Sequence, residues 1–98
     1  MDIQSLMANA KGLQSKIAEA QNSLAEKHVK GIADNGAVIV DMTGKYDVVS
    51  VTIKPEILSQ DAKTVADLVA KAYQDAKEKA DALIDGVMAK VTGGFSLE

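Results

Sequence analysis

The sequence has no cysteine, no arginine and no tryptophan, and only two tyrosines, one phenylalanine and one proline among its 98 residues. Without cysteine there is no disulfide, no thiolate metal site and no cysteine nucleophile. Without arginine, bidentate recognition of phosphate or guanine by a guanidinium group is excluded, and all 11 basic side chains are lysines. Because 14 acidic residues bring the net charge to −3, the composition argues against a strongly basic nucleic-acid coat protein.

The apolar content is high, but much of it consists of small side chains. Hydrophobic residues make up 47% of the chain, yet fifteen of them are alanine, which buries little surface. We therefore expect one domain, residues 1–98, with a small core that self-association would enlarge. The longest unbroken apolar run, residues 37–40, is too short to cross a bilayer, and the first twelve residues lack the pattern of a signal peptide. These features predict a soluble cytoplasmic protein without a membrane partner.

The first segment has a heptad pattern that predicts a helix over residues 3–27. Asp2 is placed to cap its start, whereas Gly12 weakens it by about 1 kcal/mol relative to alanine. The apolar positions, spaced alternately by three and four, are Ile3, Leu6, Ala10, Leu13, Ile17, Ala20 and Leu24.

The middle segment changes to valine, isoleucine and threonine interrupted by turn residues, which predicts strands over residues 29–33, 37–42 and 46–54. The triplet 34–36, Asp-Asn-Gly, indicates a hairpin because asparagine and glycine accept positive φ at low cost. In the third strand Val49, Val51 and Ile53 alternate with Val48, Ser50 and Thr52, so one face is more apolar than the other. Because the connections are too short for crossovers, the sheet is expected to be a three-stranded antiparallel meander.

The last segment predicts a long helix over residues 61–91. Pro55 ends the third strand and begins a short helical turn, after which Ser59 or Asp61 caps the helix. Gly93-Gly94 ends it. The order is therefore α-β-β-β-α, an α+β protomer. A lone three-stranded sheet has two open edges, so we expect a homodimer, joined either edge to edge or through the heptad seam.

Signals for an enzyme are close to absent. His28 is the single histidine, and it stands between the first helix and the first strand with no second histidine or cysteine to complete a metal site or triad. Asp81 and Asp85 share a helix face, which is typical of a solvated acidic surface. The glycines form no phosphate-binding loop. We therefore expect no catalytic residue, no metal, no cofactor and no small-molecule substrate.

The lysines are distributed unevenly. Residues 1–30 carry four lysines against three acidic residues, whereas residues 31–98 carry seven against eleven. Lys79 and Lys90 fall near the apolar stripe of the last helix. Either their stems extend along apolar surface toward water, or that end of the helix is not packed against its own core.

Short segments along nearly the whole chain form a pattern whose order and spacing are informative together. In the first helix and the strands these segments are Leu6-Met7, Ala10-Lys11, Leu13-Gln14, Lys16-Ile17, Gly31, the run from Gly36 to Val40, and Gly44. Those that follow are the run from Val48 to Pro55, Ile57-Leu58, Asp67-Leu68-Val69, Ala72, Asp75-Ala76 and Gly93-Gly94-Phe95. Taken together, they resemble the YbaB/EbfC family of bacterial nucleoid-associated proteins.

The resemblance implies a tight homodimer whose helices project as arms around a shared sheet, and which binds double-stranded DNA in the nucleoid, in some members with regulatory effects on gene expression. Binding is attributed to the first and last helices. On these helices the lysines are Lys11, Lys16, Lys27, Lys77 and Lys79. Lysines act as point charges on phosphates, so low sequence specificity is expected, and the lack of arginine predicts weak, salt-sensitive binding. Lys79 would then stand on a projecting arm. The alternative is a protein–protein adaptor with the same fold and little DNA affinity, motivated by the acidic balance and the heptad seam.

Overall fold

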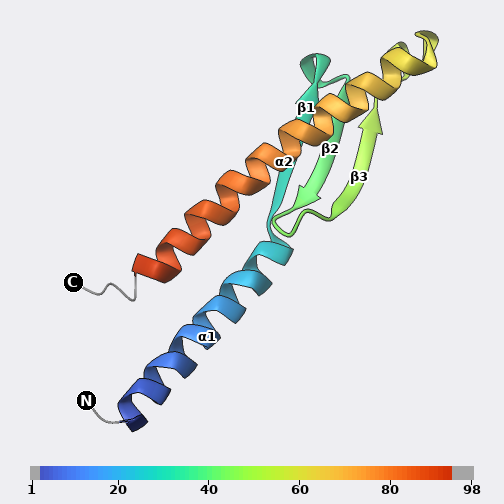
Figure 1. Cartoon of the computed structure of the whole chain (residues 1–98). Coiled ribbons are helices and arrows are strands. Elements are labelled where there is room, and N and C mark those ends of the chain that lie inside the picture. Colours follow the sequence, from blue (N-terminus) through green and yellow to red (C-terminus); the bar gives the residue numbers. More distant parts are fainter. Residues whose placement is uncertain (1–2, 94–98) are drawn as a thin grey trace.

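The computed structural model describes residues 3–93, arranged as two long helices and a three-stranded sheet (Figure 1). The predicted α-β-β-β-α order is confirmed, while Asp2 and Gly94 lie outside the described residues. The elements are α1 (Ile3–Glu26), β1 (His28–Ala33), η1 (Asp34–Gly36), β2 (Val38–Thr43), β3 (Val48–Ile53), η2 (Pro55–Ser59) and α2 (Ala62–Gly93). Within residues 3–93, no helix is long and apolar enough to cross a membrane.

The sheet is an antiparallel meander in the order β1-β2-β3, as the short connections predict. The β1–β2 turn is the expected Asp-Asn-Gly triplet. Its φ angles are 52° at Asp34, 56° at Asn35 and 93° at Gly36, so three consecutive residues adopt the left-handed region that this triplet tolerates. On the side of the sheet away from α2, the Nδ1 atom of His28 lies 2.7 Å from a carboxylate oxygen of Asp41.

Strand β3 departs from the predicted pattern in two ways. It begins at Val48 and not at residue 46, because Tyr46 has φ of 69° and belongs to the turn. A register shift then pairs Met42 with Val48, so Val49 is the extra residue of a β-bulge. Consequently Val48, and not Val49, shares the α2-facing side of the sheet with Val51.

Helix α2 crosses the sheet over β1 and β2 and leaves β3 uncovered (Figure 1). The contact is close because it is made of small residues: Ala72, Ala76 and Ala80 are fully buried, and Ala72 and Ala76 lie against Gly31 of β1. The largest fully buried side chains, Val38, Val40 and Met42, come from β2. The core is therefore a thin layer between one helix and two strands.

Helix α2 begins at an N-cap supplied by Asp61, one of the two predicted candidates. A carboxylate oxygen of Asp61 accepts a hydrogen bond from the Thr64 N–H at 2.9 Å. The Thr64 side chain, and then this N–H, lower the pKa of the Asp61 carboxyl. The Ser59 hydroxyl instead donates to the carbonyl of Glu56 within η2.

The β2–β3 turn touches both helices and fixes their relative position. The Gly44 N–H donates to the Leu24 carbonyl near the end of α1 at 2.9 Å. The Tyr46 hydroxyl donates to the Asp81 carboxylate of α2, which raises the pKa of the tyrosine. Asp81 therefore makes a tertiary contact, whereas the sequence pattern predicted that it belongs to a solvated acidic surface.

The molecule is long and narrow, with extents of 68 × 22 × 16 Å. Its radius of gyration is 19.2 Å, whereas a compact chain of this length has about 13 Å. Helix α1 and the C-terminal part of α2 account for this because both extend beyond the sheet (Figure 1), and at the free end of α1 Ile3 is 74% exposed. Of the predicted heptad seam, Ala20 and Leu24 are buried, so its N-terminal part has no cover from the described chain.

Candidate nucleic-acid interface

A cleft of about 320 Å³ lies between the second half of α1 and the last turns of α2. Three lysines line it against one glutamate, so its local charge is positive although the whole chain is acidic. Ser23 adds a hydroxyl. We call this the basic cleft; its lining residues are Lys16, Glu19, Ala20, Ser23, Lys27, Val87, Lys90 and Val91.

Helical geometry explains how the basic cleft forms. Lys16 and Lys27 are eleven residues apart, which at about 100° per residue places them within about 20° of the same helix face. Ala20 and Ser23 lie between them on this face, and small side chains there let α2 approach. Lys90 faces them from α2. Because the β2–β3 turn holds both helices, the three lysines are placed by the fold and not by one helix alone.

Two of the predicted lysines therefore come together with one that the sequence analysis did not assign to DNA. Lys90 was noted only as lying near an apolar stripe. The sequence feature that pointed to Lys90 is its position next to Val87 and Val91, which lie on the side of α2 that faces α1. Sequence alone does not show which part of α1 faces that turn.

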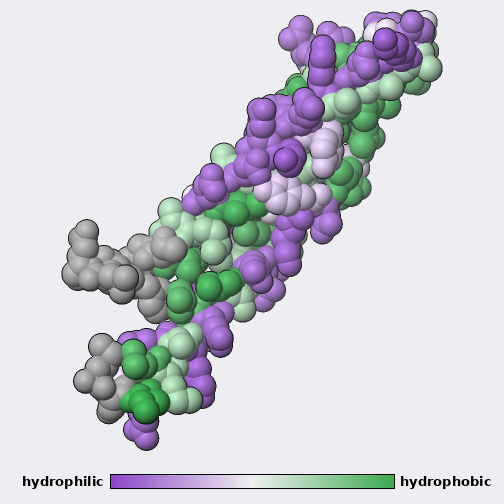
Figure 2. Space-filling model, in the orientation of Figure 1, coloured by the Kyte–Doolittle hydropathy of each residue, from purple (hydrophilic) through white to green (hydrophobic). Residues whose placement is uncertain are grey.

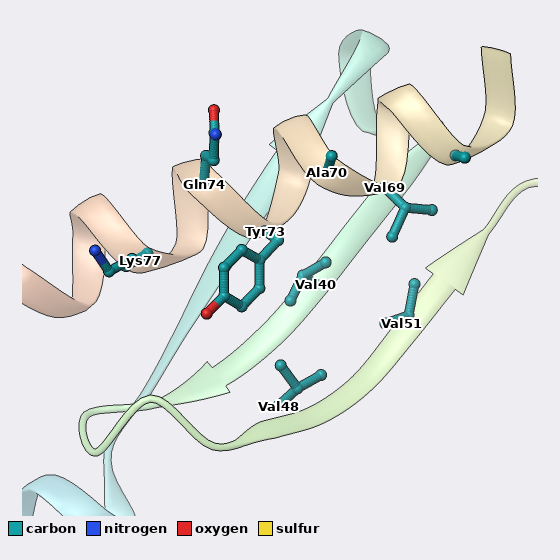
Figure 3. Close-up of a pocket in the computed structure, with 9 residues that line it drawn as sticks. Val40, Val48, Val51, Val69, Ala70, Tyr73, Gln74 and Lys77 are labelled. Atoms are coloured by element: carbon teal, nitrogen blue, oxygen red, sulfur yellow. The ribbon is translucent and has the colours of Figure 1, made fainter. Parts of the chain in front are cut away.

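The other predicted lysines lie elsewhere. Lys11 is exposed on α1, but it projects about 140° around the helix from Lys16. Lys77 lies at the edge of a second groove, between α2 and β3 (Figure 3). This groove has a volume of about 760 Å³ and is mainly apolar, with Tyr73 and Val69 of α2 pointing toward Val48 and Val51 of β3.

The prediction that Lys79 stands on a projecting arm is wrong. Its turn of α2 lies over β1, and its ammonium group donates to the Lys30 carbonyl at 2.7 Å and pairs with Asp75 at 3.0 Å. Asp75 in turn accepts the N–H of Ile32 at 2.8 Å. Together the two side chains bind backbone groups on the free edge of β1. We call Asp75 and Lys79 the β1 cap.

The β1 cap predicts an acid-dependent stability. The Ile32 N–H and then Lys79 lower the pKa of the Asp75 carboxyl in the folded state. The unfolded chain therefore binds more protons as the pH falls, and the stabilisation by the charged carboxylate, present at neutral pH, is lost as the pH falls through the native pKa. Asp75→Asn should lower the free energy of unfolding at pH 7 by less than about 1 kcal/mol, since the pair is partly exposed.

Urea denaturation of both proteins between pH 7 and pH 2 measures this effect. The difference between wild type and variant should shrink toward acid. Asp67→Asn, two turns earlier on the exposed side of α2, is the control and should show no such convergence. A constant difference across the pH range would contradict the role of the Asp75 charge.

The family-level comparison agrees with this arrangement of helices and sheet. The family model described as the YbaB/EbfC DNA-binding family matches residues 1–95. The chain belongs to this family. The resemblance predicted from the sequence is thereby confirmed, over nearly the same extent of chain.

Among curated relatives, a nucleoid-associated protein of Bradyrhizobium diazoefficiens is 38% identical over 98% of this chain and 92% of its own. A nucleoid-associated protein of Gluconobacter oxydans is 41% identical over 94% of this chain and 87% of its own. The crystal structure of an uncharacterized protein from Helicobacter pylori shares the fold. It has a TM-score of 0.64 and 15% sequence identity, over 90% of this chain and 98% of that one.

Proposed function

We propose that this YbaB/EbfC chain is a nucleoid protein that binds double-stranded DNA as a homodimer, with little sequence preference. The observation that carries the proposal is the basic cleft, because three lysines gather between two helices of an acidic chain. Family membership and the relatives' common name supply the class of ligand. We leave Lys79 out of the interface because its ammonium group is engaged in the β1 cap.

The chemistry of lysine sets the type of binding. An ammonium group binds a phosphate as a point charge and does not distinguish base edges. Binding through the cleft therefore depends on the phosphate backbone of the DNA and not on its base sequence. Lys16, Lys27 and Lys90 contribute three phosphate contacts per protomer. A dimer would then make about six, and the logarithm of the binding constant should fall with a slope of about −5 against the logarithm of the salt concentration.

Fluorescence anisotropy of a labelled mixed-sequence duplex tests the proposal. We expect saturable binding at 50 mM salt that weakens about a thousandfold by 200 mM, and Kd values that agree across unrelated duplexes within a few fold. Absence of binding at 50 mM salt would overturn the proposal and favour the adaptor alternative. A strong preference for one duplex would contradict the backbone mode.

A further inference from the structure

The basic cleft holds one carboxylate among its three ammonium groups. Glu19 lines the cleft together with Lys16, Lys27 and Lys90, and the remaining lining residues are uncharged. Three positive charges and one negative charge leave the cleft with a formal charge of +2. Among residues 3–93, Glu19 is therefore the one acidic side chain that lines the surface proposed to bind DNA.

Along the axis of α1, Glu19 lies between the two lysines that this helix contributes to the cleft. It follows Lys16 by three residues, which at about 1.5 Å per residue is about 4.5 Å along the axis, and the rotation between the two is about 60°. Side chains three residues apart are neighbours on a helix surface. A phosphate bound by the Lys16 ammonium group would therefore lie within the Debye length of the Glu19 carboxylate, which is about 10 Å at 0.1 M salt.

The charge of Glu19 is not neutralised by an ion pair. Within residues 3–93 the ion pairs are the pair of His28 and Asp41 and the pair that forms the β1 cap, and neither includes a residue of the cleft. All four charged side chains of the cleft are exposed. Because its charge is unpaired and exposed, the Glu19 carboxylate repels an approaching phosphate that the three lysines attract.

The apolar side chains of the cleft strengthen the effect of each charge. Ala20, Val87 and Val91 line the cleft, and Figure 2 shows hydrophobic residues gathered where the last turns of α2 lie beside α1. Walls of low dielectric constant focus the electric field of a charged cleft into the solvent that fills it. Attraction by the lysines and repulsion by Glu19 therefore both act more strongly on a phosphate here than they would at a flat polar surface.

We propose that Glu19 limits the affinity of the basic cleft for DNA. The inference rests on the proposed DNA binding and adds to it a residue that opposes binding. The Glu19 carboxylate contacts no phosphate in this arrangement, and it acts by raising the free energy of the phosphates that the neighbouring lysines bind. The weak, salt-sensitive binding expected of this chain thus has a local cause inside the cleft, in addition to the lack of arginine and the negative net charge.

Glu19→Gln tests the proposal, because it removes the charge and keeps the size and polarity of the side chain. In the anisotropy titration at 50 mM salt, the Kd should fall about tenfold, since a dimer carries the change twice. Glu56→Gln is the matched control. Glu56 is exposed in η2, at the opposite end of the molecule from the cleft, and its replacement changes the net charge by the same amount (Figure 1). The Kd of the control should stay within about twofold of the wild-type value.

Glu19→Lys provides a second readout, since it replaces a repelling charge by one that binds a phosphate. A dimer would then make about eight phosphate contacts, so the salt slope should steepen from about −5 to about −7, whereas Glu56→Lys should leave it unchanged.

The same titrations separate the two possible failures. A wild-type protein that does not bind at 50 mM salt would overturn the proposed function. Wild-type binding that Glu19→Gln strengthens no more than Glu56→Gln does, or a Glu19→Lys slope that stays near −5, would overturn the role of Glu19 alone.

Discussion

Replacing Gly31 by alanine should destabilise the fold by about 3 kcal/mol or more. A Cβ atom at this position of β1 would lie 1.9 Å from the Ala72 carbonyl oxygen and 2.4 Å from the Ala76 nitrogen. Both are backbone atoms of α2, so no rotamer change relieves the overlap and the helix must move off the sheet. Because the buried alanines of α2 form much of the core, such a shift opens the core along its length.

Urea denaturation followed by circular dichroism measures the change, with Gly12→Ala as the control. Gly12 lies within α1 and has nothing within 4 Å of an added Cβ, so alanine there should stabilise the helix by about 0.5–1 kcal/mol. The two identical substitutions are thus expected to act in opposite directions. A Gly31→Ala protein with wild-type stability would contradict the close seating of α2 on β1.

Local patterns in the sequence account for most of the fold. The heptad spacing of residues 3–24, the Asp-Asn-Gly turn and the broad apolar stripe after Asp61 each identify an element, because each depends on residues close in sequence. The bulge at Val49 was not predicted because it depends on the register of β3 against β2. The left-handed backbone of Tyr46 was not predicted either, because glycine and asparagine are the residues that signal this conformation in a sequence.

The candidate site was only partly predictable for the same reason. Lys16 and Lys27 lie on one helix face, so their association follows from spacing. Lys90 lies beside them in the basic cleft, and Lys79 binds the β1 edge, through contacts between residues far apart in the chain. Lys79 binds a carbonyl 49 residues earlier, and nothing in the neighbourhood of either residue signals that partner.

The triple variant Lys16→Glu, Lys27→Glu and Lys90→Glu should lose DNA binding almost completely. Each change removes a proposed phosphate contact and places a carboxylate in the basic cleft, and a dimer carries each change twice. At 50 mM salt we expect affinity to fall by at least about a hundredfold, with the salt slope of any residual binding close to zero. The same anisotropy titration measures both quantities.

The control triple variant replaces Lys54, Lys63 and Lys71 by glutamate. These lysines are exposed and lie in the half of the molecule where α2 begins. Both variants move the formal net charge from −3 to −9, so general repulsion from DNA is the same in the two proteins. Both should sediment as dimers. A difference between them therefore isolates the cleft, because long-range charge, oligomeric state and the number of substitutions are matched. Equal losses of affinity would show that binding follows net charge alone and would contradict the assignment of Lys16, Lys27 and Lys90.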